Sequence, residues 1–67
     1  MTGYWVEDDE NKEFGFETLT AAKRRARVLM ARREKKGDIS PIVHVIANDN
    51  SHAWLFDCYA QCWHEDA

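Results

Sequence analysis

Glycine and proline are scarce in this sequence: three glycines and one proline occur among 67 residues. No stretch rich in glycine, proline or serine suggests a linker, so we expect a single domain over residues 1–67. Uninterrupted apolar runs such as VLMA and AWLF are far shorter than the roughly 20 residues that a membrane-spanning helix needs. The first ten residues have neither the basic nor the apolar segment of a secretion signal. These absences predict a cytoplasmic protein with no membrane partner.

The cysteines and histidines do not have the spacing of a common zinc site. Cys58, Cys62 and His64 give the pattern Cys-x3-Cys-x-His, with His44 and His52 further upstream. A structural zinc ion needs four ligands around one point. On one strand, the two cysteines would lie about 13 Å apart. We therefore expect no metal site, and reduced cysteines that pack as small apolar residues.

Residues for catalysis are also few. The chain has two serines, and no glycine-rich phosphate loop follows an expected strand. A nucleophile pair can be drawn from Cys58 and His44, but any chain with two cysteines and three histidines allows such a pair. A domain of this size has little volume for an enclosed pocket. We expect no enzymatic activity and no cofactor.

One stretch, AKRRARVLMARREKK at residues 22–36, holds eight of the nine Lys and Arg residues in a chain of net charge −3. Thr18 is a predicted helix N-cap and Gly37 a predicted C-terminal stop. Between them, five apolar residues recur within an arc of about 100°, the width of a core stripe. These are Leu19, Ala22, Ala26, Leu29 and Met30. The pattern predicts a helix over residues 19–36.

The other apolar residues favour strands. Phe14 and Phe16 alternate with polar or small residues after a polar turn, which predicts a first hairpin. Residues 42–47, IVHVIA, are a β-branched run, and a tight polar turn after them favours pairing with a strand at 53–59. Helical spacing also fits residues 53–65, so strand and helix both stay open there. We predict an α+β fold: a four-stranded antiparallel sheet in the order ββαββ, with one helix packed on one face.

The side of the helix opposite its apolar stripe is expected to bind a partner. The preceding segment carries six acidic residues against one lysine, and the following segment five acidic residues against no Lys or Arg. These carboxylates can neutralise cations that flank the stripe, which we expect for Lys23, Arg27 and Lys36, but they cannot readily reach the far side. The predicted partner-binding residues are Arg24, Val28, Arg32 and Lys35. The partner would be an acidic protein surface or nucleic-acid phosphates; a merely solvated helix is the alternative.

Both faces of the later strands are apolar, but only one helix is available to cover them. The uncovered face should form a contiguous apolar patch, and such patches often mark interfaces. The predicted interface patch consists of Ile42, His44, Ile46, Trp54 and Phe56. A homodimer would bury it. Alternatively, the C-terminal residues 61–67 fold back over it.

The chain resembles small proteins of phages and mobile elements, among them anti-CRISPR inhibitors of type I systems. The resemblance rests on ETLTAAKRRA opening a helix, strongest over residues 16–26, and on a hairpin ending in a Trp-containing strand over residues 42–63. It implies a stoichiometric inhibitor without catalysis, which blocks a nucleic-acid-handling host defence complex by protein–protein contact. The alternative is a small nucleic-acid-binding or regulatory protein that uses residues 22–36. The net charge of −3 disfavours that alternative.

Overall fold

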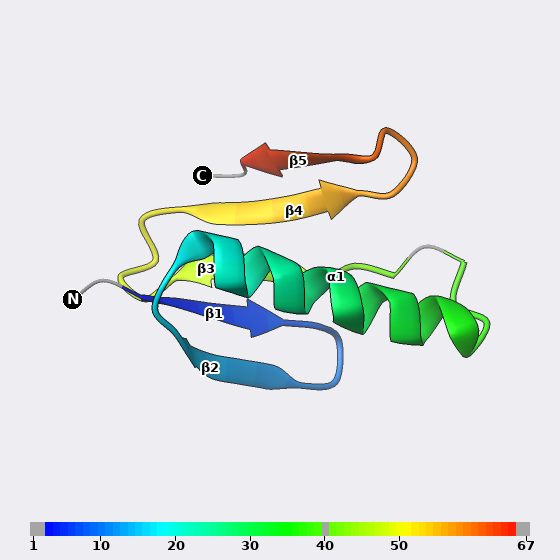
Figure 1. Ribbon diagram of the computed structural model, residues 1–67, viewed down its shortest axis with the longest axis horizontal. Helices are drawn as coiled ribbons and strands as arrows, with labels where there is room; N and C mark the ends of the chain where they lie inside the picture. Colours follow the sequence, from blue (N-terminus) through cyan, green and yellow to red (C-terminus); the bar gives the residue numbers. More distant parts are fainter. Residues whose placement is uncertain (1–2, 40, 66–67) are drawn as a thin grey trace.

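The computed structural model describes residues 3–39 and 41–65. One helix, α1, lies across one face of a single antiparallel sheet with strand order β2-β1-β3-β4-β5 (Figure 1). The elements are β1 (Tyr4–Glu7), β2 (Lys12–Phe16), α1 (Leu19–Lys35), β3 (His44–Ala47), β4 (Ala53–Asp57) and β5 (Cys62–Glu65). The predicted α+β class with one helix on one face is confirmed. The prediction of four strands is wrong, because β5 adds a fifth.

The fifth strand comes from the segment that the sequence pattern left ambiguous. Asp57 Oδ1 accepts hydrogen bonds from the backbone N–H groups of Tyr59 and Ala60, at 2.9 and 3.0 Å. Gln61 then adopts a positive φ of 56°. An aspartate that bonds the backbone beyond it, followed by a left-handed residue, reverses the chain into a hairpin. Neither a helix over residues 53–65 nor a strand that continues to 59 is therefore formed, and β5 extends the sheet instead of covering its face.

The ends of α1 are set by its capping residues. Thr18 Oγ1 accepts a hydrogen bond from the backbone N–H of Ala21 at 3.1 Å, as an N-cap does. Gly37, with φ of 99°, follows the C-cap residue Lys36. Both predicted ends are confirmed, with the last helical residue at Lys35 instead of 36.

The core lies between α1 and the sheet. Along α1 the buried residues are Ala22, Ala26 and Met30, while Leu19 and Leu29 pack beside them half-buried. Two of the three buried helix residues are alanines, so the helix axis can approach the strands closely. On the sheet the buried residues are Val6, Val45, Ala47 and Phe56, and Val43 is buried just before β3 begins. The predicted stripe is thus the side of α1 that packs on the sheet.

Phe14 and Phe16 lie on opposite faces of the sheet because β2 contains a bulge, whereas strict alternation would place them on the same face. The β1–β2 register shifts beside Trp5, which faces both Phe14 and Gly15. Gly15 has φ of 96°, a conformation that glycine adopts readily and that suits the extra residue of a bulge. Phe16 therefore packs against the core, whereas Phe14 stacks on Trp5 on the other face of the sheet.

Candidate functional site

The eight basic residues of segment 22–36 divide into three groups according to their surroundings. The first group is neutralised by carboxylates. Arg25 donates hydrogen bonds to both carboxylate oxygens of Glu13 on β2, at 2.8 and 3.0 Å. Arg33 forms ion pairs of 3.1 to 3.7 Å with three carboxylates, those of Asp8, Asp9 and Asp38. The hydrogen bond from Arg25 lowers the pKa of Glu13, and the one to Asp38 raises the pKa of Arg33. These two arginines hold α1 against the β1–β2 hairpin.

The second group lies on aromatic rings. Lys23 Nζ is 5.2 Å from the ring centroid of Trp63 and 6.0 Å from that of Trp54, while Arg27 Cζ is 3.9 Å from the centroid of Phe56. Since α1 lies mainly over β1, β2 and β3, its cations on this flank cover rings on β4 and β5. Cation–π attraction and the apolar stems of both side chains stabilise this contact. The expectation that carboxylates neutralise these two residues is therefore wrong.

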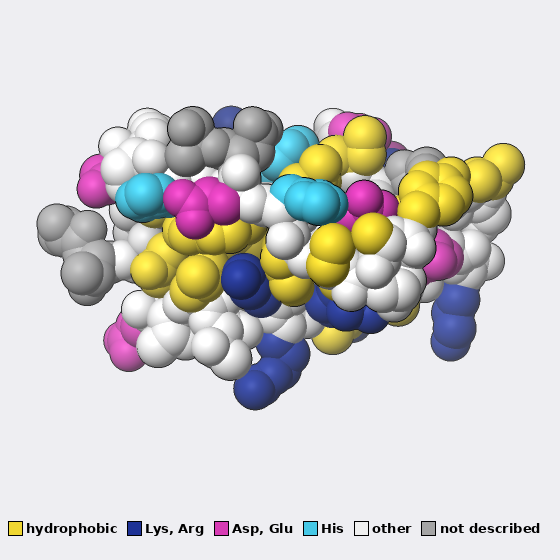
Figure 2. All heavy atoms as spheres, turned by 90° about the horizontal axis from the view of Figure 1, so that it is seen from above, with side chains coloured by type: hydrophobic (Ala, Val, Ile, Leu, Met, Phe, Trp, Pro, Cys, Tyr) yellow, Lys and Arg dark blue, Asp and Glu magenta, His cyan; other side chains and the backbone are white. Residues whose placement is uncertain are grey.

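The third group comprises exposed cations that make no such contact. Within residues 3–39 and 41–65, no ion pair or ring contact engages Arg24, Arg32, Lys35 or Lys36. We call the residues Arg24, Val28, Arg32 and Lys35 the outer face of α1. All four are exposed, and Val28 keeps 39% of its surface accessible. Basic side chains project from the lower edge of the view in Figure 2, the side of the molecule that carries α1. The prediction that this face binds a partner stays a prediction.

The sheet face away from α1 is the second candidate surface. No described element covers this open face, which presents Trp5, Phe14, Ile42, His44, Ile46 and Leu55. Three residues of the predicted patch, Ile42, His44 and Ile46, are among them. Trp54 and Phe56 were assigned to the patch wrongly, because Trp54 pairs with the buried Val45 and shares its face.

Three residues of this open face were missed by the sequence reasoning. Trp5 and Leu55 follow from the register, in which Trp5 pairs with Ile46 and Leu55 with His44. Side chains alternate between the two faces along a strand, so counting residues from a buried valine would have placed both side chains on the open face. The position of Phe14 on the open face results from the bulge, and the only sequence signal for that bulge is the neighbouring glycine.

The cysteines occupy different environments. Cys58 lies half-buried against the core, as expected, but Cys62 is exposed on β5 because the turn between them reverses the chain. His64 Nε2 lies 3.7 Å from Cys62 Sγ and 3.2 Å from Asp57 Oδ2. Both contacts use the same ring nitrogen, so these groups do not form the relay of a catalytic triad, which needs both nitrogens. In the described part of the chain, no group of three or more His, Cys, Asp and Glu residues is placed to hold a metal ion.

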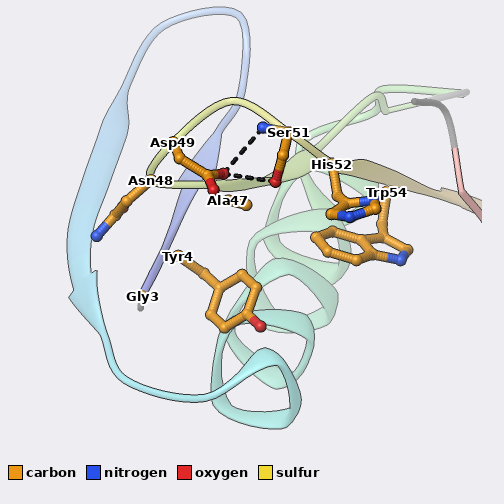
Figure 3. A pocket seen from close by; sticks show the side chains of 8 residues that line it. All are labelled: Gly3, Tyr4, Ala47, Asn48, Asp49, Ser51, His52 and Trp54. Atoms are coloured by element: carbon orange, nitrogen blue, oxygen red, sulfur yellow. Dashed lines mark hydrogen bonds between the residues drawn. The ribbon is translucent and has the colours of Figure 1, made fainter. Parts of the chain in front are cut away.

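A hollow of about 140 Å³ lies beside the β3–β4 turn (Figure 3). Its main carboxylate, Asp49, accepts hydrogen bonds from the hydroxyl and the backbone N–H of Ser51, at 2.6 and 2.9 Å. The hydroxyl contact is the main cause of the lowered pKa of Asp49. On the other side, Trp54 meets Tyr4 edge to face and stacks on His52. The hydrogen bonds between Asp49 and Ser51 therefore stabilise the β3–β4 turn, and this structural role explains why these polar residues are present.

Comparisons with protein-family models, with curated proteins and with solved structures found no match to this chain. Among the residues that the structure describes, no helix is both long and apolar enough to cross a membrane. The chain thus presents two candidate surfaces for binding, the outer face of α1 and the open face of the sheet.

Proposed function

We propose that this chain is a non-enzymatic, cytoplasmic binding protein that contacts an acidic protein surface through the outer face of α1. The division of the eight cations supports this proposal most. Four of them are engaged by carboxylates or rings. Among the described residues, no carboxylate pairs with Arg24, Arg32 or Lys35, although Arg32 lies near enough to Glu13 to help lower the pKa of that carboxyl. Like charges one turn apart on this face repel each other. A partner of opposite charge would offset that repulsion.

The character of the outer face favours a protein over nucleic acid. Val28 is exposed at its centre, one helical turn from Arg24 and from Arg32. An apolar centre with a charged rim is typical of protein–protein interfaces. Phosphate contacts gain nothing from a valine, and a net charge of −3 opposes approach to nucleic acid.

The resemblance to small phage inhibitors suggests the kind of partner. We propose a host defence complex that handles nucleic acid, blocked by a chain that occupies one of its protein surfaces in fixed stoichiometry. The second candidate is a nucleic-acid-binding or regulatory protein, favoured by the clustering of cations along one helix. It predicts phosphate contacts in place of carboxylate contacts.

The test is capture of a partner from nuclease-treated host extract by the tagged chain. The variant Arg24→Glu/Lys35→Glu reverses two charges of the outer face. The control, Lys12→Glu/Lys36→Glu, changes the net charge equally with exposed residues outside that face. We expect the wild type and the control to retain one protein, and the outer-face variant to retain about tenfold less, because like charges across an interface disfavour binding.

Equal capture by all three chains would contradict the proposal. The nucleic-acid alternative makes a different prediction: nuclease treatment abolishes capture, and the pure chain binds duplex DNA. Its log K should then fall steeply with log salt, with a slope of about −0.9 per phosphate contact.

A further inference from the structure

We propose that the open face of the sheet is a homodimer interface, in which Phe14 of each copy enters a hollow on the other copy. This interface lies on the side of the molecule opposite the outer face of α1. It goes beyond the proposed function, and either proposal can fail without the other.

Phe14 is a projecting side chain that is nevertheless held in place. It is 68% exposed. Its ring stacks on Trp5 with centroids 5.4 Å apart, and Lys12 Nζ lies 5.3 Å from the centroid of Trp5. Trp5 in turn lies beside Ile46 of the neighbouring strand. A large apolar side chain that is already ordered loses little conformational freedom when it binds, which favours its use as an anchor.

The hollow lies on the same face, beyond β3, where β4 and β5 meet the segment before β3. Pro41, Ile42, Leu55, Tyr59 and His64 line it together with residues 56–58, which include the carboxylate of Asp57. Its volume is about 200 Å³. A cavity of about 150 Å³ holds a benzene ring, so one phenylalanine ring fits. Ile42 is 50% exposed and Tyr59 80%, so the walls are apolar surface in contact with water.

A second copy is the occupant that the arrangement of these two features favours. Both lie on one face of one sheet, so Phe14 cannot reach the hollow of its own chain. A two-fold axis between two facing sheets, perpendicular to the line from Phe14 to the hollow, brings each Phe14 onto the other copy's hollow. The contact then forms twice, as in an isologous dimer.

The residues that lie between Phe14 and the hollow would face the same region of the second copy. Lys12 pairs with Glu7 across β1 and β2, and Glu7 pairs with His44 across β1 and β3. This row carries both signs of charge. With the axis between β1 and β3, Glu7 of one copy lies opposite His44 of the other, so the carboxylate faces an imidazole that can donate a hydrogen bond to it.

The small area of the face indicates a weak dimer. Five strands at about 4.8 Å spacing, each up to five residues long, give a face of about 400 Å² in plan per copy. Two such faces bury about 800 Å², which is below the roughly 1,200 to 2,000 Å² of stable interfaces and within the range of weak, transient ones. We therefore expect a weak dimer, with a Kd of about 10 to 100 µM.

The test is sedimentation equilibrium of the full chain from about 1 to 500 µM, a range that brackets this Kd. The mass should rise from 7.8 kDa toward twice that value. Phe14→Lys and Ile42→Asp should each weaken self-association by about tenfold or more, since each replaces an apolar contact by a charged side chain that must lose its water to enter the interface. Both residues are exposed, so the circular dichroism spectrum should not change. Val28→Asp, an equivalent change on the outer face of α1, should leave the dimer intact.

Mixing the two variants tests the contact itself. A heterodimer of Phe14→Lys with Ile42→Asp has one native contact and one lysine–aspartate contact. Equal mixing should therefore restore dimers that neither variant forms alone. A wild type that stays at 7.8 kDa at the highest concentration would overturn the proposal, even if the Phe14 variant loses capture of a host protein. A dimer that neither variant weakens would also overturn it, as would variants that dissociate but do not recover on mixing.

Discussion

Truncation of Met30 tests how α1 is held on the sheet. Met30 is 2% exposed and packs in the core with Val6, Val43 and Val45. Met→Ala changes in cores cost about 2 to 5 kcal/mol of unfolding free energy. At roughly 0.05 to 0.15 kcal/mol per residue, the 67-residue chain has a total stability of about 3 to 10 kcal/mol. Met30→Ala should therefore remove a large part of the stability of the fold.

Urea unfolding followed by far-UV circular dichroism measures this loss. A domain of this size has an m-value of about 1 kcal/mol/M, so a loss of 2 kcal/mol moves the midpoint by about 2 M. Val28→Ala is the matched control on the exposed side of the same helix and should stay within about 0.5 kcal/mol of the wild type. If Met30→Ala shifts the midpoint no more than Val28→Ala does, α1 does not pack through this stripe.

Two further predictions concern the carboxylate pair and the cysteines. The hydrogen bond from Arg25 lowers the pKa of Glu13 below its usual 4.5, so the ionised form stabilises the fold above that pH and the stabilisation is lost as pH falls through the lowered value. Glu13→Gln should thus lower the Tm at pH 7, with a smaller difference from wild type near pH 3; an equal difference at both would contradict this. Cys58→Ser should lower the Tm because that thiol packs on the core, whereas Cys62→Ser should leave it unchanged. A larger loss of Tm for Cys62→Ser than for Cys58→Ser would contradict the position of the β4–β5 turn.

The helix was the element best predicted from sequence, because independent local signals agree there. A hydroxyl at Thr18, a glycine at 37 and the apolar spacing between them each indicate the same boundaries. The outer face of α1 follows from the same geometry, since it is the arc opposite the stripe. Its exposure was therefore predictable even though its partner was not.

The pairing of distant residues could not be read from local patterns. The register of β3 on β4 decides that Trp54 faces the helix, and it depends on how the polar turn closes. Arg25 and Arg33 reach carboxylates on the β1–β2 hairpin, while Lys23 reaches rings on β4 and β5. These contacts join residues far apart in the chain, so spacing alone cannot assign them. The β4–β5 turn could not be predicted because a single aspartate within an apolar run is a weak local signal, so the strand was expected to continue to residue 59.

The basic residues of α1 divide into those that hold the fold and those that we propose contact a partner. Thermal unfolding of two matched double reversals tests this division directly. Arg25→Glu/Arg33→Glu places two carboxylates against the acidic residues that the arginines now bind, and should lower the Tm markedly. Arg24→Glu/Lys35→Glu changes the net charge equally and should leave the Tm nearly unchanged. Equal losses from the two variants, or a larger loss from the outer pair, would contradict this division of the helix.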